Sequence, residues 1–150
     1  MHAAFSVDDS GELFFTGGVS GGYGLLVRAE FSREYILGLL NSKLLDWFVH
    51  QIATSMRGGW FSFESRFIKS LPIRTIDFSN PSDKTRHDRM VKLVESMLSL
   101  HKQLAAAKSA AQTEVLRRQI DATDAEIDRL VYDLYGLTEE EIAIVEGKNS

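Results

Sequence analysis

Apolar residues recur at helical spacing throughout the second half of the chain. Steps of three and four place them on one face of an α-helix. The first run follows Asn80-Pro81, where asparagine suits the N-cap and proline the first helical turn. Its apolar positions are Met90, Leu93, Met97, Leu100, Leu104 and Ala107. This pattern predicts one long helix beginning near residue 80.

A second run of the same kind follows almost at once. Ser109-Ala-Ala-Gln112 has the form of a capping box, and Gly136 suits a C-cap. The seam between them consists of Leu116, Ile120, Thr123, Ile127, Leu130, Leu134 and Leu137. The opposite, polar face consists of Glu114, Arg117, Arg118, Asp121, Asp124 and Asp128. Two such seams predict an antiparallel helical hairpin whose helices, at about 25 residues each, would reach about 37 Å.

Two details of this hairpin can be predicted from neighbouring residues. The hydroxyl of Thr123 occupies a seam position, and it can be satisfied by the carbonyl of Gln119 in its own helix. Thr138-Glu-Glu-Glu141 is another capping box, so a short last helix is expected after it.

The first half of the chain predicts shorter elements. Residues 12–16 and 23–28 have the composition of strands, with a glycine-rich loop between them. Ser32 suits the N-cap of a helix, and we expect Asn41-Ser42 to interrupt that helix. Residues 54–63 then predict a loop entering a short strand, and residues 64–70 a helical turn. The expected fold is α+β and helix-rich.

Two domains follow from these elements. A small, partial domain with short strands and helices is expected over residues 1–78, and the helical hairpin over residues 79–150. The turn-prone Ser79-Asn-Pro-Ser82 separates them.

Composition excludes several classes of protein. With 44% hydrophobic and 25% charged residues, the chain has the composition of a soluble globular protein. It contains no cysteine, which excludes a disulfide framework and a thiolate nucleophile. The four histidines are scattered without metal-ligand spacing. No apolar run approaches the roughly 20 residues of a membrane span, so we expect a cytoplasmic protein with no membrane partner.

The net charge of −4 is an average over unlike segments. Residues 51–76 carry a net charge of +3, and residues 121–150 a net charge of −7. A contact with nucleic acid would therefore be local, with the acidic end turned away from the DNA.

The basic segment also holds the residue types that bind DNA. Cations, hydroxyls and exposed amides contact the DNA backbone, and arginine reads guanine edges in the major groove. The candidate DNA-binding residues are Thr54, Ser55, Arg57, Gly58, Gly59, Trp60, Arg66 and Lys69. The alternative is a loop whose aromatic residues enter the core and whose arginines are solvated, and composition alone leaves both readings open.

No catalytic constellation accompanies this segment. Gly22-Tyr-Gly24 lacks the third glycine of a dinucleotide fingerprint and precedes a predicted strand instead of following one. The paired carboxylates Asp8-Asp9 lie near a terminus, and those of residues 139–141 lie in a helix cap. We therefore expect no metal site and no catalytic residue.

Five segments, in the right order, resemble the TaqI-like C-terminal specificity domain of type IIG restriction–modification enzymes and adenine-specific DNA methyltransferases. They are Tyr35-Ile-Leu-Gly-Leu-Leu-Asn-Ser-Lys-Leu-Leu-Asp-Trp-Phe48, Met56-Arg-Gly-Gly-Trp-Phe61, Phe67-Ile-Lys-Ser-Leu-Pro-Ile73, Gln119-Ile-Asp-Ala-Thr-Asp-Ala-Glu-Ile-Asp128 and Leu130-Val-Tyr-Asp-Leu-Tyr-Gly-Leu-Thr138. The resemblance implies a target recognition module that reads double-stranded DNA. It also implies a methyltransferase part that binds S-adenosylmethionine, sometimes beside a nuclease.

The chain lacks the Asn-Pro-Pro-Tyr-type catalytic motif of such enzymes, and Asn80-Pro-Ser-Asp83 does not replace it. We therefore expect a specificity piece or C-terminal fragment with no enzymatic activity and no cofactor of its own. Its expected partners are DNA, the methyltransferase or nuclease part, and a second copy of the chain through the helical arm. The alternative function is a helical scaffold for protein interaction.

Overall fold

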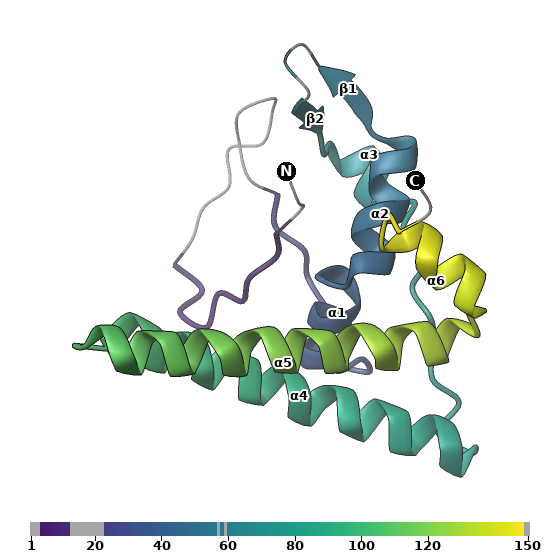
Figure 1. The fold of residues 1–150 in the computed structure, drawn as a ribbon. Helices are drawn as coiled ribbons and strands as arrows, with labels where there is room; N and C mark the ends of the chain where they lie inside the picture. The colour runs from purple at the N-terminus through teal and green to yellow at the C-terminus, as the bar shows by residue number, and fades with distance from the viewer. Residues whose placement is uncertain (1–3, 13–22, 57, 59, 149–150) are drawn as a thin grey trace. The chain divides into compact units, whose positions relative to one another are not determined.

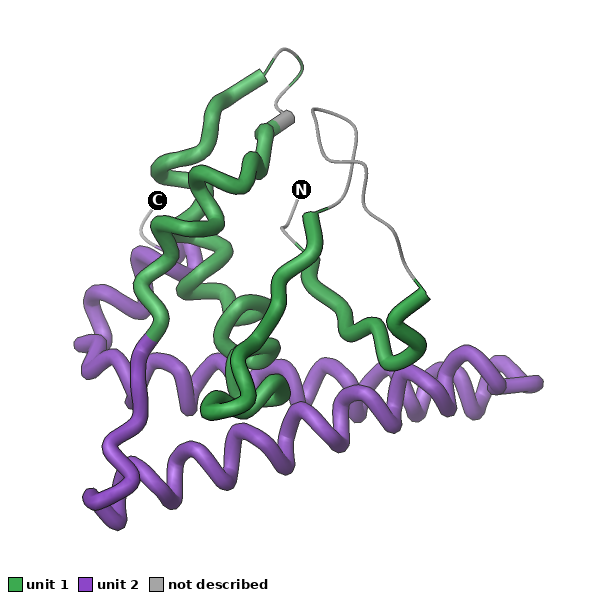
Figure 2. The backbone as a smooth tube through the Cα atoms, turned by 180° about the vertical axis from the view of Figure 1, so that it is seen from behind, with its two compact units in different colours: residues 1–73 green, residues 74–150 purple. Residues whose placement is uncertain are grey.

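The structure is a computed structural model that describes residues 4–12, 23–56, 58 and 60–148. The chain divides into two compact units, Met1–Ile73 and Arg74–Ser150, which Figure 2 colours separately. Helices dominate both, and a small antiparallel sheet lies in the first, so the expected helix-rich α+β class is confirmed. We predicted that a DNA-recognition domain ends at residue 78 and that a helical arm begins at residue 79. That assignment of functions to the two parts stays a prediction.

The first unit is built on two consecutive helices, α1 (Arg33–Leu40) and α2 (Lys43–Ile52). The hydroxyl oxygen of Ser32 accepts from the amide of Tyr35, which confirms the predicted N-cap of α1. The predicted interruption is also confirmed, because Ser42 caps α2 and donates its hydroxyl to the carbonyl of Leu39 at 2.7 Å. The apolar core of this unit consists of Tyr35, Leu37, Leu39, Leu40, Leu45, Val49 and Leu71.

A small hairpin follows α2. Strands β1 (Thr54–Met56) and β2 (Trp60–Ser62) pair antiparallel, with Thr54 opposite Ser62 and Met56 opposite Trp60 (Figure 1). The expected loop over residues 54–56 is therefore wrong, whereas the expected short strand that follows it is present. Gly58 has φ +87°, a left-handed conformation that glycine adopts without steric cost, and it lies in the turn that brings the two strands together. Helix α3 (Ser65–Ile68) confirms the predicted helical turn.

The predicted strand at residues 23–28 is not a strand in the structure. Leu25 is 49% exposed and Leu26 is fully exposed, so little apolar burial offsets the cost of ordering this backbone. A strand also needs a hydrogen-bonded neighbour. Most of the neighbour that we predicted, residues 13–16, and the loop at 17–22 lie outside the described residues.

The second unit contains the predicted pair of long helices. Helix α4 (Pro81–Ala106) is capped by Asn80, and α5 (Ala110–Tyr135) begins at Ser109 and ends at Gly136, which is left-handed with φ +67°. Helix α6 (Glu139–Val145) begins with the predicted capping box at Thr138. These three helix starts are confirmed.

The two long helices run antiparallel and lie side by side (Figure 1). The guanidinium of Arg86 near the start of α4 lies 2.7 Å from the carboxylate of Asp133 near the end of α5. Further along, Arg89 lies 3.5 Å from Glu126. The residue number in α5 decreases as the residue number in α4 increases, which is the order expected for antiparallel helices. These ion pairs therefore confirm the antiparallel hairpin.

The buried face of α5 is wider than the predicted seam. Leu116, Ile127, Leu130 and Leu134 are buried as expected, and the hydroxyl of Thr123 donates to the carbonyl of Gln119 at 2.8 Å, as predicted. Asp128, however, is only 3% exposed, so its predicted place on the polar face is wrong. A straight helix drifts about 20° per heptad relative to a seven-residue repeat, which widens the stripe that packing can bury. Val131 and Tyr132 are buried beside Asp128 for the same reason.

Candidate nucleic-acid interface

The predicted DNA-binding residues lie on the β1–β2 hairpin and the following helix. Thr54 and Ser55 belong to β1 and are exposed. Trp60 begins β2, opposite Met56. Gly58 lies in the turn, whereas Arg57 and Gly59 lie outside the described residues. The candidate residues that the structure describes therefore lie on one β-hairpin and on the helix that follows it. Their role in binding DNA stays a prediction.

Two phenylalanines attach this hairpin to helix α2. The imidazole of His50 meets the ring of Phe61 edge-on at 4.6 Å and the ring of Phe63 at 5.2 Å. Nδ1 of His50 lies 2.6 Å from the carbonyl oxygen of Asp46, one turn earlier in α2, which fixes the orientation of the imidazole. Phe61 and Phe63 are only half-buried. These two aromatics pack against α2 and hold the hairpin in place, but they do not enter the core as the alternative interpretation expected.

Arg66 is held beside the hairpin by polar contacts. Its guanidinium donates to both oxygens of Glu64, with Nη2 at 3.2 Å from Oε1 and Nε at 3.2 Å from Oε2. Nη2 also lies 3.5 Å from the hydroxyl oxygen of Thr54, and the guanidinium carbon lies 4.6 Å from the ring centre of Phe67. The side chain remains 65% exposed. The guanidinium of Arg66 is thus held in one orientation by contacts within the protein, and the carboxylate of Glu64 offsets part of its positive charge.

Glu64 is a residue that the candidate list left out. It is the single acid within the net charge of +3 that residues 51–76 carry. The signal was present, because an acid two residues before an arginine at a helix start can pair with it. The carboxylate also accepts from the hydroxyl of Ser62 at 3.4 Å, so it links β2 to α3.

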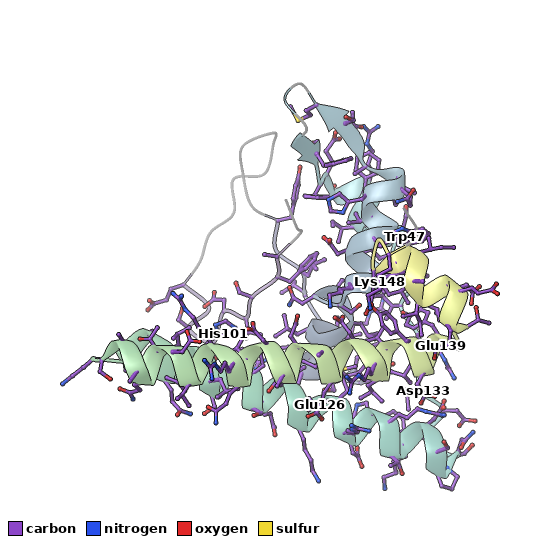
Figure 3. The ribbon with its side chains drawn as sticks, viewed as in Figure 1. Trp47, His101, Glu126, Asp133, Glu139 and Lys148 are labelled. Carbon is purple, nitrogen blue, oxygen red and sulfur yellow. The ribbon has the colours of Figure 1, made fainter. Side chains whose placement is uncertain are left out.

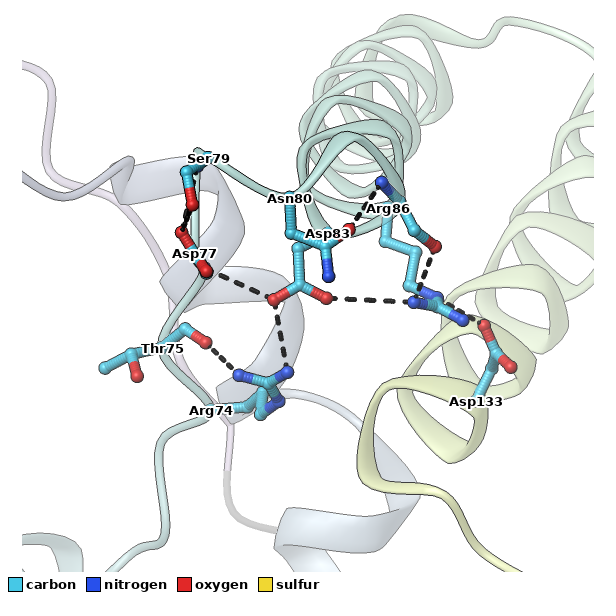
Figure 4. Close-up of polar contacts among 9 residues, drawn as sticks. Arg74, Thr75, Asp77, Ser79, Asn80, Asp83, Arg86 and Asp133 are labelled. Atoms are coloured by element: carbon cyan, nitrogen blue, oxygen red, sulfur yellow. Dashed lines mark hydrogen bonds and ion pairs between the residues drawn. The ribbon is translucent and has the colours of Figure 1, made fainter.

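Lys69 and Arg74 have different environments. Lys69 ends α3 and is exposed, and no ion pair to it occurs within the described part of the chain. Arg74 belongs to the second unit, where Nη2 lies 3.1 Å from the carboxylate of Asp83 (Figure 4). The positive charge of Arg74 is therefore compensated by Asp83 within the protein. The net charge of +3 over residues 51–76 thus overstates the positive charge with which this segment could bind a polyanion.

The network around Asp83 is a second feature that sequence reasoning missed. Asp83 is 5% exposed and accepts from the amide of Asp77 at 3.2 Å (Figure 4). Nη1 of Arg86 lies 3.7 Å from its other oxygen. The amide of Arg74 donates to the hydroxyl oxygen of Tyr135 at 3.1 Å. These contacts fasten residues 74–83 to the start of α4 and the end of α5.

Other classes of site find no support in the described residues. No helix there is both long enough and apolar enough to cross a membrane. Within the same ranges, no group of histidine and acidic side chains is arranged to hold a metal ion.

Comparisons with known proteins place this geometry in context. Residues 21–73 match the family model of the TaqI-like C-terminal specificity domain, a stretch that contains the hairpin and α3. The chain is also similar to the type II restriction enzyme and methyltransferase RM.Eco57I of Escherichia coli, with 28% identity over 137 residues. That similarity covers 89% of this chain but only 13% of the relative's length. No solved structure matches the chain significantly. The resemblance seen in the sequence is thereby confirmed, and residues 21–73 are similar to the TaqI-like C-terminal specificity domain.

Proposed function

We propose that this chain is the DNA-recognition module of a restriction–modification enzyme. The observation that carries the proposal is the specificity-domain match, because it includes the whole hairpin and α3, where hydroxyls and cations gather. The partners would be double-stranded DNA and the catalytic part of the same enzyme. That part would bind S-adenosylmethionine and methylate adenine at N6, while this chain would bind no cofactor.

Each candidate residue has a chemical role in this proposal. The hydroxyls of Thr54 and Ser55 would bond to phosphate oxygens, as would the ammonium of Lys69. Arg57 would read a base edge, since arginine forms a bidentate pair with guanine in the major groove. Arg66 would meet DNA in a fixed orientation because Glu64 already holds it. The amides of Gly58 and Gly59 would approach the DNA backbone closely because glycine has no side chain, and Trp60 would contact DNA beside them.

The main experiment measures DNA binding as a function of salt. Replacing Arg57 with glutamine is expected to cost about 1–3 kcal/mol on the target sequence and to relax specificity at one position. Lys69→Gln is expected to weaken all sequences equally and to lower the salt slope by about one. Lys92→Gln, an exposed lysine in α4, is the matched control and leaves the slope unchanged. Normal binding by both the Arg57 and the Lys69 variants would contradict the proposal.

Glu64 provides a test in the opposite direction. Glu64→Gln removes the charge that offsets Arg66, so affinity for DNA of any sequence is expected to rise and the salt slope to steepen. Weaker binding by this variant would show that the orientation of Arg66 matters more than its charge, and unchanged binding would show that Arg66 does not contact DNA.

Calorimetry tests the absence of a cofactor site. Titration of the chain with S-adenosylmethionine is expected to show no heat of binding, because no cofactor motif was found in the sequence. A micromolar affinity would contradict this part of the proposal.

The alternative function, a helical scaffold for protein interaction, is tested by binding to DNA and to heparin. If the chain fails to bind either of them at low salt, the scaffold becomes the better interpretation.

A further inference from the structure

The turn end of the α4–α5 hairpin carries an uncompensated positive charge. Residues 101–118 contain four cations and one acid, a net charge of +3. The cations are Lys102, Lys108, Arg117 and Arg118, and the acid is Glu114. All five are exposed. We call residues 101–118 the hairpin tip.

Few contacts within the protein neutralise these cations. Arg118 pairs with Glu114 one turn earlier, at 3.0 Å, and both side chains are more than half exposed. No ion pair to Lys102, Lys108 or Arg117 occurs in the part of the chain that the structure describes. An exposed pair of this kind contributes little and leaves the guanidinium available to another anion.

The other end of the same helices differs both in net charge and in how far its cations are paired. There Arg86 pairs with Asp133 and Asp83, and Arg89 pairs with Glu126. From Asp121 onward the chain carries nine acids and two cations. In Figure 3, His101 lies toward the turn between α4 and α5, while Asp133 and Glu139 lie toward the opposite end. The charge is therefore separated along the hairpin axis, and a polyanion would be attracted to the tip and repelled by the base.

The tip also has the dimensions of a backbone contact. At a rise of about 1.5 Å per residue, the first eight residues of α5 extend about 12 Å from the turn, which corresponds to about three to four base pairs of DNA. Alanines at positions 105–107, 110 and 111 surround the turn. Small side chains there would let lysine and arginine reach phosphates without steric obstruction.

We propose that the hairpin tip is a second, sequence-independent contact with the DNA backbone. The inference rests on the proposed function, because it takes double-stranded DNA as the partner. It assigns the tip to phosphates and leaves base reading to the β1–β2 hairpin. None of the tip cations belongs to the specificity-domain match at residues 21–73.

Two double variants with equal change in charge test this inference. The tip variant is K102Q/R117Q, with one cation removed from α4 and one from α5. The base variant is K84Q/R129Q, which also removes one exposed lysine from α4 and one exposed arginine from α5. Glutamine preserves helix propensity, so both variants are expected to fold, as circular dichroism would verify. Binding of the full chain to a mixed-sequence duplex is measured by fluorescence anisotropy between about 50 and 200 mM salt.

The expected result is a fall of about two in the salt slope for the tip variant alone, with preference among sequences unchanged. Equal salt slopes for the tip and base variants would overturn the inference. This holds if both slopes fall by the same amount, which would be an effect of net charge alone, and also if both slopes equal that of the unmodified chain. In that case DNA binding by the unmodified chain would still support the proposed function. If the unmodified chain does not bind DNA at all, the proposed function fails and this inference fails with it.

Discussion

Asp83 is expected to stabilise the second unit more than any other charged residue of α4. Its carboxylate is nearly buried and has three partners, namely Arg74 Nη2 at 3.1 Å, Arg86 Nη1 at 3.7 Å and the amide of Asp77 at 3.2 Å. Asp83→Ala would remove all of them at once. The same change would take the acceptor from the amide of Asp77 and one anionic partner from each of Arg74 and Arg86, although Arg86 would keep Asp133.

The magnitude follows from the burial of those partners. Removing one member of a fully buried ion pair costs about 3–5 kcal/mol, because the remaining charge is left unpaired. Here the side chains of Arg74 and Arg86 are 39% and 33% exposed, so water can solvate them in the variant. Hydrogen bonds to charged groups contribute about 1.5–3 kcal/mol each before such discounting. We therefore expect Asp83→Ala to lower the free energy of unfolding by about 2–3 kcal/mol.

Urea denaturation measures this difference as a change in midpoint at constant slope. Asp88→Ala is the matched control in the same helix, since Asp88 is 54% exposed and, among the residues that the structure describes, forms an ion pair only with the adjacent His87. It is expected to stay within about 0.5 kcal/mol of the unmodified protein. Asp83→Asn keeps an acceptor for the amide of Asp77 and should fall between the two. A cost for Asp83→Ala no larger than that of Asp88→Ala would refute the reasoning, as would strict additivity of Arg74→Ala and Asp83→Ala in a double-mutant cycle.

Three further predictions concern α5. Ile127 is 6% exposed, so Ile127→Ala is expected to cost about 2–5 kcal/mol in the same assay and Ile127→Asp more; a cost below about 1 kcal/mol for alanine would contradict this packing. Burial raises the pKa of Tyr132 above its ordinary value of 10.0, and nearby carboxylates raise it further. The folded state then holds the phenol proton more tightly than the unfolded state, so this contribution to stability is complete below about pH 10 and is lost as pH rises further. The Tyr132→Phe variant should therefore lose less free energy of unfolding between neutral pH and pH 11 than the unmodified protein does. If the variant and the unmodified protein lose the same amount, the burial of Tyr132 is contradicted. Hydrogen exchange should show amides 120–134 protected as strongly as those of α2, whereas rates of a free peptide would mean that the hairpin does not pack in this chain.

The helix limits could be predicted because capping is local chemistry. Ser32, Asn80, Ser109 and Thr138 each accept a hydrogen bond from an amide two or three residues later, and Gly136 adopts the left-handed conformation that suits the end of a helix. These interactions join residues so close in sequence that any context preserves them. The same holds for the bond between Thr123 and Gln119.

The candidate site could be predicted only as a set of residue types. The sequence places hydroxyls, glycines and cations together over residues 54–69, but it does not say which cations are already paired. Arg66 shares its charge with Glu64, and Arg74 is bound to Asp83, nine residues away. Composition counts both as free positive charges, because pairing depends on where the backbone turns.

What the sequence determined by itself is therefore the positions of the helices, their caps and the antiparallel pairing of α4 with α5. The tertiary structure decided the strand at residues 54–56, the irregular conformation of residues 23–28 and the burial of Asp83 and Asp128. The physical reason is the range of the interactions. A cap or a helical face depends on residues within a few positions, whereas a strand or a buried carboxylate exists only when packing brings it suitable partners.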